Sequence, residues 1–155
     1  MKTYKILFVC LGNICRSPMA EYVLRHEAAI AGVSHRLHIK SAGTSGWHNG
    51  KGMHQGTASK LKQHNISSSG FVSSQVTAQD AEEYDYIIAM DDNNLADLKP
   101  LFRIDSTQTF KLTDLIPDAG YTLVPGPYHT GDFDETYHLV NTASRALLKK
   151  LDLLD

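Results

Sequence analysis

The sequence predicts an α/β protein, a three-layer sandwich in which helices cover both faces of a four-stranded parallel sheet. Short, nearly continuous apolar runs alternate with segments whose apolar residues recur at helical spacing. Such runs are typical of strands buried on both faces, and their alternation with helices is typical of parallel sheets. The 155 residues contain no repeat and no linker, so we expect a single domain over residues 1–155.

The first third of the chain predicts a strand, a tight loop and a helix. Residues 4–10 form an apolar run, and residues 11–16 follow as the loop. Ser17 is a favoured N-cap residue and Pro18 a favoured first helical residue. The helix that they begin is expected to end near Gly32, because glycine commonly terminates helices.

The remaining elements continue this alternation. Apolar runs predict three further strands, over residues 37–41, 86–90 and 109–112. Helical spacing and capping residues predict helices over residues 57–64, 77–83 and 91–98, and a C-terminal helix with Tyr137, Val140, Ser144, Leu147 and Leu151 on one face. The proline- and glycine-containing residues 115–132 are expected to form a long loop.

Three polar or reactive residues lie at or just past the carboxyl ends of predicted strands. They are Cys10, Ser41 and Asp91. In open parallel sheets, ligands bind in the crevice at these carboxyl ends. We therefore expect the three residues to converge on one site.

Composition and charge argue against several classes of protein. Hydrophobic residues make up 42% and charged residues 21% of the chain, as in ordinary globular proteins, and the formal net charge is −2. This balance does not favour binding to nucleic acid or to a membrane, and no segment has transmembrane length. Any binding of anions must therefore come from a few groups gathered in one place.

The cysteines and histidines do not predict a disulfide framework or a metal site. Cys10 and Cys15 are the two cysteines, and the eight histidines form no close ligand set with carboxylates. We interpret the histidines as scattered surface residues and expect neither a metal nor a cofactor. The N-terminal apolar run is too short for a signal peptide, so we expect a cytoplasmic setting in which a cysteine is more often reactive than structural.

The chemistry is carried by Cys10, the five residues after it, Arg16 and Ser17. A loop between a strand and a helix N-terminus directs its backbone N–H groups toward a bound phosphate. Gly12 permits close approach, and the planar guanidinium of Arg16 can hold two phosphate oxygens. The same positive field favours the thiolate of Cys10, which makes it a nucleophile. The competing interpretation is a buried cysteine at the end of a core strand, with an arginine nearby.

The segment Val9-Cys10-Leu11-Gly12-Asn13-Ile14-Cys15-Arg16-Ser17-Pro18-Met19-Ala20-Glu21 resembles the signature of the low-molecular-weight protein-tyrosine phosphatases almost residue for residue. The resemblance spans about residues 4 to 150. Its further matches are Ser41-Ala42-Gly43-Thr44 with Trp47, Asp85-Tyr86-Ile87-Ile88-Ala89-Met90-Asp91 with Asn94-Leu95, and Pro127-Tyr128. It implies the phosphotyrosine phosphatase I-like fold, with a four-stranded parallel sheet.

The resemblance also implies a two-step hydrolysis of phosphotyrosine in proteins. Cys10 attacks the phosphate to form a cysteinyl-phosphate, Arg16 and the loop N–H groups stabilise the transition state, and water hydrolyses the intermediate. By similarity, Asn13 holds the loop through partners that include Ser41, and Ser17 stabilises the thiolate. Phosphotyrosine-containing proteins are the expected partners, and phosphate or vanadate the expected small ligands.

By the same resemblance, the binding loop is made of Leu11, Gly12, Asn13, Ile14, Cys15 and Ser17. Four residues are similar to the walls of a slot for a phenyl ring: Leu11, Ile14, Trp47 and Tyr128. For Trp47 and Tyr128 the alternative interpretation is packing within their own loops.

The general acid of the family is missing from its expected position. Related sequences carry Asp-Pro-Tyr or Asp-Pro-Trp in the late loop, whereas this chain has Gly126-Pro127-Tyr128, and glycine cannot donate a side-chain proton. Three explanations remain open. Gly126 is a lesion that traps substrate, an aspartate at position 118, 132 or 134 takes over, or the protein binds phosphotyrosine with little turnover. Capping of the last helix is the alternative role for Asp132 and Asp134. A smaller departure lies at residues 71–75, where family members tend to carry a histidine and an arginine.

The sequence therefore predicts a protein-tyrosine phosphatase that is impaired by Gly126. One alternative is a protein-arginine phosphatase, whose loop resembles Cys-Thr-Gly-Asn-Thr-Cys-Arg. There a threonine stands at the position of Ile14, which suits a guanidinium better than an aryl ring. An arsenate reductase would need a further pair of redox cysteines. A phosphotyrosine-binding protein with weak or no turnover is the alternative from another class.

Overall fold

The computed structural model describes residues 1–154 and shows a sheet of four parallel strands. The strands are β1 (Tyr4–Cys10), β2 (Leu37–Gly43), β3 (Tyr86–Ala89) and β4 (Thr109–Lys111), in the spatial order β2-β1-β3-β4. β1 pairs with both β2 and β3, which makes it a central strand. The predicted fold class and the four predicted strands are confirmed.

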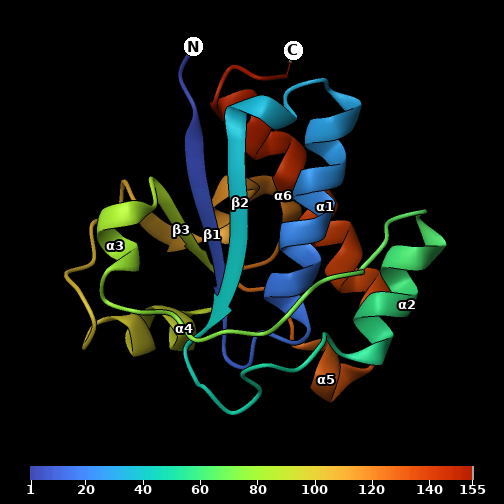
Figure 1. The fold of residues 1–155 in the computed structure, drawn as a ribbon, viewed down its shortest axis with the longest axis horizontal. Coiled ribbons are helices and arrows are strands. Elements are labelled where there is room, and N and C mark those ends of the chain that lie inside the picture. The colour runs from blue at the N-terminus through green and yellow to red at the C-terminus, as the bar shows by residue number, and fades with distance from the viewer. Residues whose placement is uncertain (155) are drawn as a thin grey trace.

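Helices cover both faces of this sheet (Figure 1). One face carries α1 (Arg16–Ile30) and α6 (Phe133–Lys150), with α2 (Gln55–Gln63) packed against them, and the other carries α3 (Asp80–Glu83) and α4 (Asp92–Leu98). Alternate residues of β1 serve the two faces: Ile6, Phe8 and Cys10 enter the core with α1 and α6, whereas Leu7 and Val9 enter the smaller core on the other face. Burial on both faces explains why the run is continuously apolar.

The late connection differs from the predicted loop. Residues 115–132 contain a 3₁₀ turn, Pro117–Ala119, and a single-turn helix, α5 (Pro127–Thr130). Each begins with a proline, whose fixed φ suits a first helical position. Two further 3₁₀ turns, Ser34–Arg36 and Leu112–Leu115, were not predicted.

The start of α1 also corrects a prediction. Ser17 is not the N-cap, because α1 already begins at Arg16 and Cys15 occupies the capping position without a side-chain bond. Ser17 lies within the first turn, and its hydroxyl contacts groups beneath the loop instead.

The two aspartates at helix starts do act as caps. The Asp91 carboxylate accepts a hydrogen bond from the backbone N–H of Asn94 at 2.8 Å, and that of Asp132 accepts one from Glu135 at 2.9 Å. These bonds satisfy N–H groups that have no partner within the helix. Asp132 thus has the capping role that its position before the last helix suggested.

The carboxyl ends of β1, β2 and β3 meet at the edge of the molecule that lies opposite the N-terminus (Figure 1). The loop after β1, the connection of residues 44–54 and α5 gather at this edge. Within residues 1–154, no helix has both the length and the apolar character needed to cross a membrane.

Candidate active site

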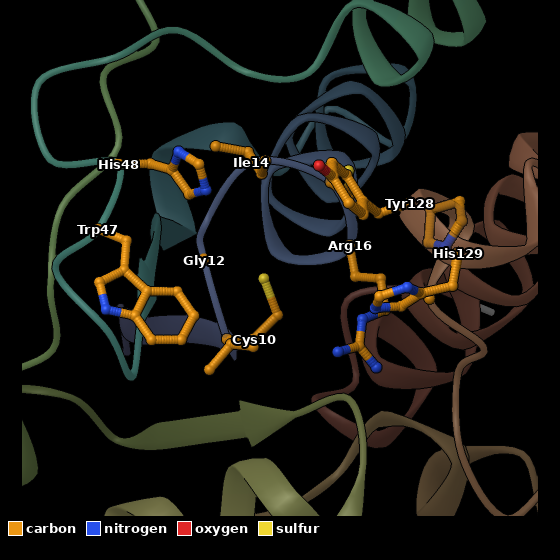
Figure 2. A pocket seen from close by; sticks show the side chains of 12 residues that line it. Cys10, Gly12, Ile14, Arg16, Trp47, His48, Tyr128 and His129 are labelled. Carbon is orange, nitrogen blue, oxygen red and sulfur yellow. The ribbon is translucent and has the colours of Figure 1, made fainter.

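A pocket of about 280 Å³ opens at the carboxyl edge of the sheet, at the end of β1 (Figure 2). Three segments that are distant in sequence supply its lining: the loop after β1, the connection after β2, and α5 with the residue before it. The lining residues are Cys10, Leu11, Gly12, Ile14, Cys15, Arg16, Trp47, His48, Gly126, Pro127, Tyr128 and His129. Apart from His48, Pro127 and His129, these are residues that the sequence placed in the site.

The phosphate loop, residues 11–16, turns its carbonyls outward. The carbonyl oxygens of four residues accept hydrogen bonds of 2.6–2.9 Å from groups outside the loop: Cys10 from Thr44 N, Leu11 from Ser45 N, Asn13 from Ser73 Oγ, and Ile14 from His54 N. A planar peptide whose carbonyl points outward directs its N–H inward. No N–H of residues 11–16 has a protein acceptor within residues 1–154. The loop therefore presents unpaired amide donors, as a phosphate requires.

Asn13 holds this loop from beneath. It has φ 55°, a left-handed conformation that asparagine tolerates better than most residues, and it is fully buried. Its amide nitrogen donates to Ser17 Oγ at 2.8 Å and to Ser41 Oγ at 2.9 Å, and its amide oxygen accepts from Ser74 N at 3.0 Å. One side chain thus joins the loop to α1, to β2 and to the segment before residue 76.

The buried support continues beyond Ser41. Its hydroxyl donates to Glu21 Oε1 at 2.6 Å, and Glu21 Oε2 pairs with Arg25 Nη2 at 2.7 Å. Burial raises the pKa of Glu21 above its ordinary value, and the bonds from Ser41 and Arg25 oppose that rise. A chain of polar contacts therefore runs from the surface of α1 to the underside of the phosphate loop.

The nucleophile candidate, Cys10, lies at the inner end of the same chain. Its Sγ is 3.0 Å from Ser17 Oγ, and both residues are buried. Because Ser17 Oγ accepts from Asn13, its own proton is free for the sulfur, and the Ala42 carbonyl at 3.5 Å is a weaker alternative. A hydroxyl that donates to sulfur stabilises negative charge there.

Cys15 is the second thiol of the pocket and has a different character. Burial raises its pKa to about 11, and the neighbouring Cys10 adds to the rise. Cys15 is thus a neutral thiol near neutral pH. Both cysteines are free.

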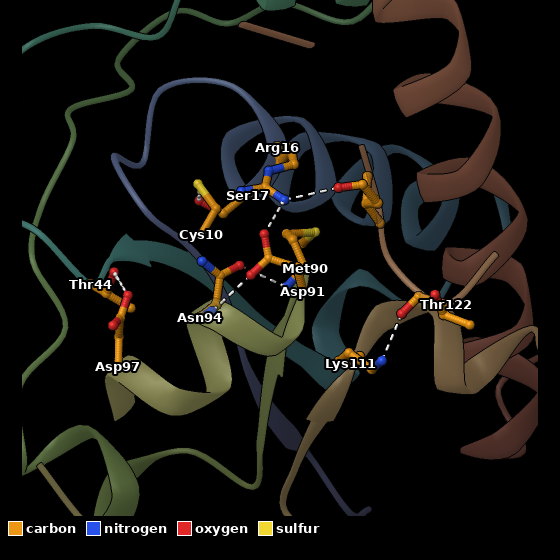
Figure 3. Close-up of polar contacts among 11 residues, drawn as sticks. Cys10, Arg16, Ser17, Thr44, Met90, Asp91, Asn94, Asp97, Lys111 and Thr122 are labelled. Atoms are coloured by element: carbon orange, nitrogen blue, oxygen red, sulfur yellow. Dashed lines mark hydrogen bonds and ion pairs between the residues drawn. The ribbon is translucent and has the colours of Figure 1, made fainter. Parts of the chain in front are cut away.

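Arg16 is anchored by two acceptors on the side of the pocket toward β3 (Figure 3). Its Nη1 donates to Asp91 Oδ2 at 2.7 Å and to the carbonyl of Val124 at 2.9 Å. Asp91 is in turn fixed by capping α4 through Asn94 N. Within residues 1–154, Nη1 is the guanidinium nitrogen that the protein engages, which leaves Nε and Nη2 as donors for a ligand.

The rim of the pocket is apolar and exposed. Trp47, Tyr128 and Leu11 are 73%, 65% and 41% exposed, and Figure 2 shows Trp47 and Tyr128 on opposite sides of the opening. The Tyr128 ring lies edge-on to His54, with centroids 5.7 Å apart, and His54 stacks on Phe133 at 5.4 Å. Packing against His54 therefore positions the Tyr128 ring in part. Trp47 is mostly exposed and is available to contact a ligand.

Gly126 borders the pocket and has room for a side chain. Its φ of −78° suits any residue, and an added Cβ would meet a single neighbour, His129 Cδ2, at 3.6 Å. That distance is ordinary van der Waals contact. The glycine is therefore not required by the backbone conformation or by close packing.

The aspartates that the sequence offered as substitutes lie outside the pocket lining. Asp132 caps α6, Asp134 is 82% exposed and pairs with Lys60, and Asp118 lies in the 3₁₀ turn of residues 117–119. Within residues 1–154, the lining contains no carboxylate, and no three His, Cys, Asp or Glu side chains gather to hold a metal ion.

Sequence reasoning missed two histidines of the pocket lining. His48 and His129 line the pocket, whereas the sequence had given them no role beyond that of scattered surface residues. Each follows a predicted wall residue, Trp47 or Tyr128, which was the available signal. Asp91 was expected near the site, but its pairing with Arg16 was not predicted.

The fold and the pocket define a class of α/β proteins with a cysteine at the end of a central strand and unpaired amide N–H groups before the following helix. The family model for "Low molecular weight phosphotyrosine protein phosphatase" matches residues 5–153. The low molecular weight protein-tyrosine-phosphatase YfkJ of Bacillus subtilis is 43% identical over 147 residues, which cover 94% of each chain. The chain belongs to the family of low-molecular-weight protein-tyrosine phosphatases, which are phosphoric monoester hydrolases.

Solved structures agree with this family. The crystal structure of YfkJ superposes with a TM-score of 0.94 at 40% identity and covers 98% of this chain and 96% of that one. A Drosophila protein described as an arginine phosphatase has the same fold, with a TM-score of 0.85 at 29% identity and coverage of 97% and 98%.

Proposed function

We propose that this protein hydrolyses phosphotyrosine in other proteins through a cysteinyl-phosphate formed on Cys10. The observation that carries the proposal is the phosphate loop, whose N–H groups have no protein acceptor within residues 1–154 and in which the carbonyls of Leu11, Asn13 and Ile14 are bonded to groups outside the loop. Such a loop in front of a helix N-terminus binds a phosphate dianion without any cation beyond Arg16. Cys10 lies at the base of the loop, where its sulfur would face the phosphorus of a bound phosphate.

In the first step, the Cys10 sulfur attacks phosphorus while the bond to the aryl oxygen breaks. The loop amides, with Nε and Nη2 of Arg16, stabilise the charge on the three remaining oxygens. Asp91 and the Val124 carbonyl keep Arg16 in place before substrate arrives, so little orientation is lost on binding. In the second step, water attacks the phosphorus and releases inorganic phosphate and the thiolate.

An aryl ring is the substrate group that fits the rim best. Leu11 and Ile14 supply apolar walls, and Trp47 and Tyr128 supply exposed aromatic surfaces on opposite sides. The Drosophila neighbour makes phosphoarginine the second candidate. The apolar Ile14 disfavours it, because a buried guanidinium needs hydrogen-bond acceptors that an isoleucine does not offer.

Gly126 makes the proposed enzyme slow on poor leaving groups. General acid catalysis by a positioned group contributes about 10²–10⁴-fold, and no carboxyl group lines the pocket within residues 1–154. A tyrosine oxygen departs poorly without a proton, whereas a nitrophenol oxygen departs readily as an anion. If turnover is very slow, the protein functions as a phosphotyrosine-binding module. In either case we propose that it works in a reducing compartment such as the cytoplasm.

Two substitutions test the mechanism. Cys10→Ser should abolish release of phosphate from aryl phosphates while the protein still binds phosphate or vanadate, because the loop amides and Arg16 remain. Arg16→Ala should lose both turnover and binding, whereas the exposed Arg103→Ala serves as the matched control. Substantial turnover by Cys10→Ser would rule out the covalent mechanism.

A second assay separates the functional candidates. Peptides that carry phosphotyrosine or phosphoarginine are compared by the kcat/KM for phosphate release. We expect the phosphotyrosine peptide to be preferred. A preference for phosphoarginine assigns the arginine phosphatase activity, and saturable binding of the phosphotyrosine peptide without phosphate release assigns the binding module.

A further inference from the structure

The pocket lacks a carboxylic acid but contains two imidazoles. Its lining includes no aspartate or glutamate within residues 1–154, but it includes the imidazole side chains of His48 and His129, and histidine is the residue that most often serves as a general acid or base. Tyr128 also lines the pocket, but histidine serves as a general acid more often than tyrosine does. The two imidazoles are therefore the candidates for the group that gives a proton to the leaving oxygen.

His129 lies next to the position of the missing acid. Gly126 immediately precedes α5, and its O accepts the backbone N–H of His129 at 3.0 Å. The imidazole of His129 folds back over this turn, so that its Cδ2 would be 3.6 Å from a Cβ at position 126. The imidazole of His129 therefore lies close to the place that an acidic side chain at position 126 would occupy.

The two histidines lie on opposite sides of the site. Figure 2 shows His129 on the side of Arg16 and Tyr128, and His48 on the side of Trp47. His48 packs closely against the phosphate loop, because a Cβ added at Gly12 would be only 3.0 Å from its Cδ2. His48 therefore lies beside the loop wall, whereas His129 lies at the mouth, on α5.

We propose that His129 is the general acid of this protein, in place of a carboxylic acid at position 126. The proposal rests on the function proposed above. In the first step the Cys10–phosphorus bond forms, the phosphorus–oxygen bond to the aryl group breaks, and the N–H of the His129 imidazolium gives its proton to the departing oxygen. The products of this step are the cysteinyl-phosphate, a neutral phenol and a neutral imidazole.

The second step restores the histidine. The neutral imidazole of His129 takes a proton from the water that attacks phosphorus, the sulfur–phosphorus bond breaks, and inorganic phosphate leaves. The Cys10 thiolate and the His129 imidazolium are regenerated, so the cycle consumes water and needs no other reactant. Because His129 is exposed and on a single-turn helix, we expect it to be a weaker acid catalyst than a carboxylic acid fixed at position 126.

A double-mutant cycle tests this role. The wild-type protein, His129→Gln, Gly126→Asp and the double variant are compared by kcat on a phosphotyrosine peptide and on 4-nitrophenyl phosphate. His129→Gln should lower kcat on the phosphotyrosine peptide about 10–100-fold and on nitrophenyl phosphate much less. In the Gly126→Asp background the same substitution should have little effect, because the new carboxylic acid supplies the proton.

Two controls separate a chemical role from a structural one. The exposed His138→Gln on α6 is the matched histidine substitution. Free imidazole should restore turnover of phosphotyrosine to His129→Ala but should not accelerate His138→Gln.

Each outcome has a defined meaning. Equal kcat for His129→Gln and the wild type on phosphotyrosine overturns the role of His129 and leaves the proposed phosphatase function intact. An equal loss on both substrates, or a loss that persists in the Gly126→Asp background, also overturns it, because that pattern indicates a role in binding or folding. Absence of turnover in all four proteins, on both substrates, refutes the proposed function itself.

Discussion

The phosphate loop and the segment around Gly126 border the same pocket but are held very differently. In the phosphate loop, a fully buried asparagine and several outward-facing carbonyls are bonded to neighbouring elements. In the segment of residues 123–131, Val124 and Pro127 are buried, whereas Leu123 and Tyr128 are exposed and Gly126 has free space beside it.

This difference separates the parts of the site that tolerate change from those that do not. A substitution under the phosphate loop breaks buried hydrogen bonds and is expected to displace the N–H donors that we propose bind phosphate. A substitution at Gly126 alters no described contact apart from the one with His129. We therefore expect that a proton donor can be introduced at position 126 without a change of fold.

The largest change in kcat is expected for a substitution at Gly126, where the pocket has room for a side chain. In the His129→Gln background, which has no other proposed acid, Gly126→Asp should raise kcat on phosphotyrosine about 10²–10⁴-fold. In the wild type the gain should be smaller, because His129 already supplies part of this factor. On nitrophenyl phosphate both gains should be smaller, because only the poor leaving group depends strongly on a proton. Gly126→Ala is the matched control, since its methyl group fits the same space without an acid. If Gly126→Asp leaves the rate on phosphotyrosine unchanged, the protein already has an adequate proton donor.

Substitution beneath the phosphate loop should be damaging. Asn13→Gly permits the left-handed backbone but leaves Ser17, Ser41 and Ser74 without their partner. We expect a loss of about 1–3 kcal/mol in the free energy of unfolding, measured by urea denaturation, and a marked loss of phosphate affinity. Asn65→Gly is the control, because Asn65 has a similar φ of 61° but lies on the surface. Equal effects of the two substitutions would mean that the backbone conformation, not the amide network, matters.

The two thiols should differ in reactivity. Cys10 and Cys15 are expected to form a disulfide after peroxide treatment, with oxidation starting at Cys10. Because burial raises the pKa of Cys15 to about 11, the fraction of its thiolate grows roughly tenfold for each pH unit below that value. Closure of the disulfide should therefore accelerate from pH 7 to pH 10, as followed by the mass loss of two hydrogens. Sulfonated or free thiols without this mass loss would contradict the pairing.

The smallest effects are expected at the aspartates after α5. Asp132→Asn keeps a good N-cap residue, and Asp134→Asn removes an exposed partner of Lys60, an ion pair of a kind that contributes little. Both variants should retain kcat on phosphotyrosine within about twofold of the wild type, since neither residue lines the pocket. A large loss in either variant would identify an aspartate as the proton donor and would count against His129.

Sequence patterns predicted most of the fold because its signals are local. β1 is a continuous apolar run, and Asp91 and Asp132 precede their helices as capping residues. The expectation that Cys10, Ser41 and Asp91 converge needed only the rule that parallel strands end at one edge. Helix boundaries were less accurate: at Ser17, a residue type that commonly caps helices is drawn into the first turn by contacts with Asn13 and Cys10.

By itself, the sequence determined the α/β sheet, the phosphate loop of Cys10 and Arg16, and the absence of an acid at position 126, since each depends on residues adjacent in the chain. Only the tertiary structure decided which distant groups meet at that loop. Asp91 pairs with Arg16 across 75 residues, and His129 approaches the pocket because a single helical turn folds it back over Gly126. Such contacts depend on how β3 and α5 pack beside β1, and no spacing in the sequence encodes that packing.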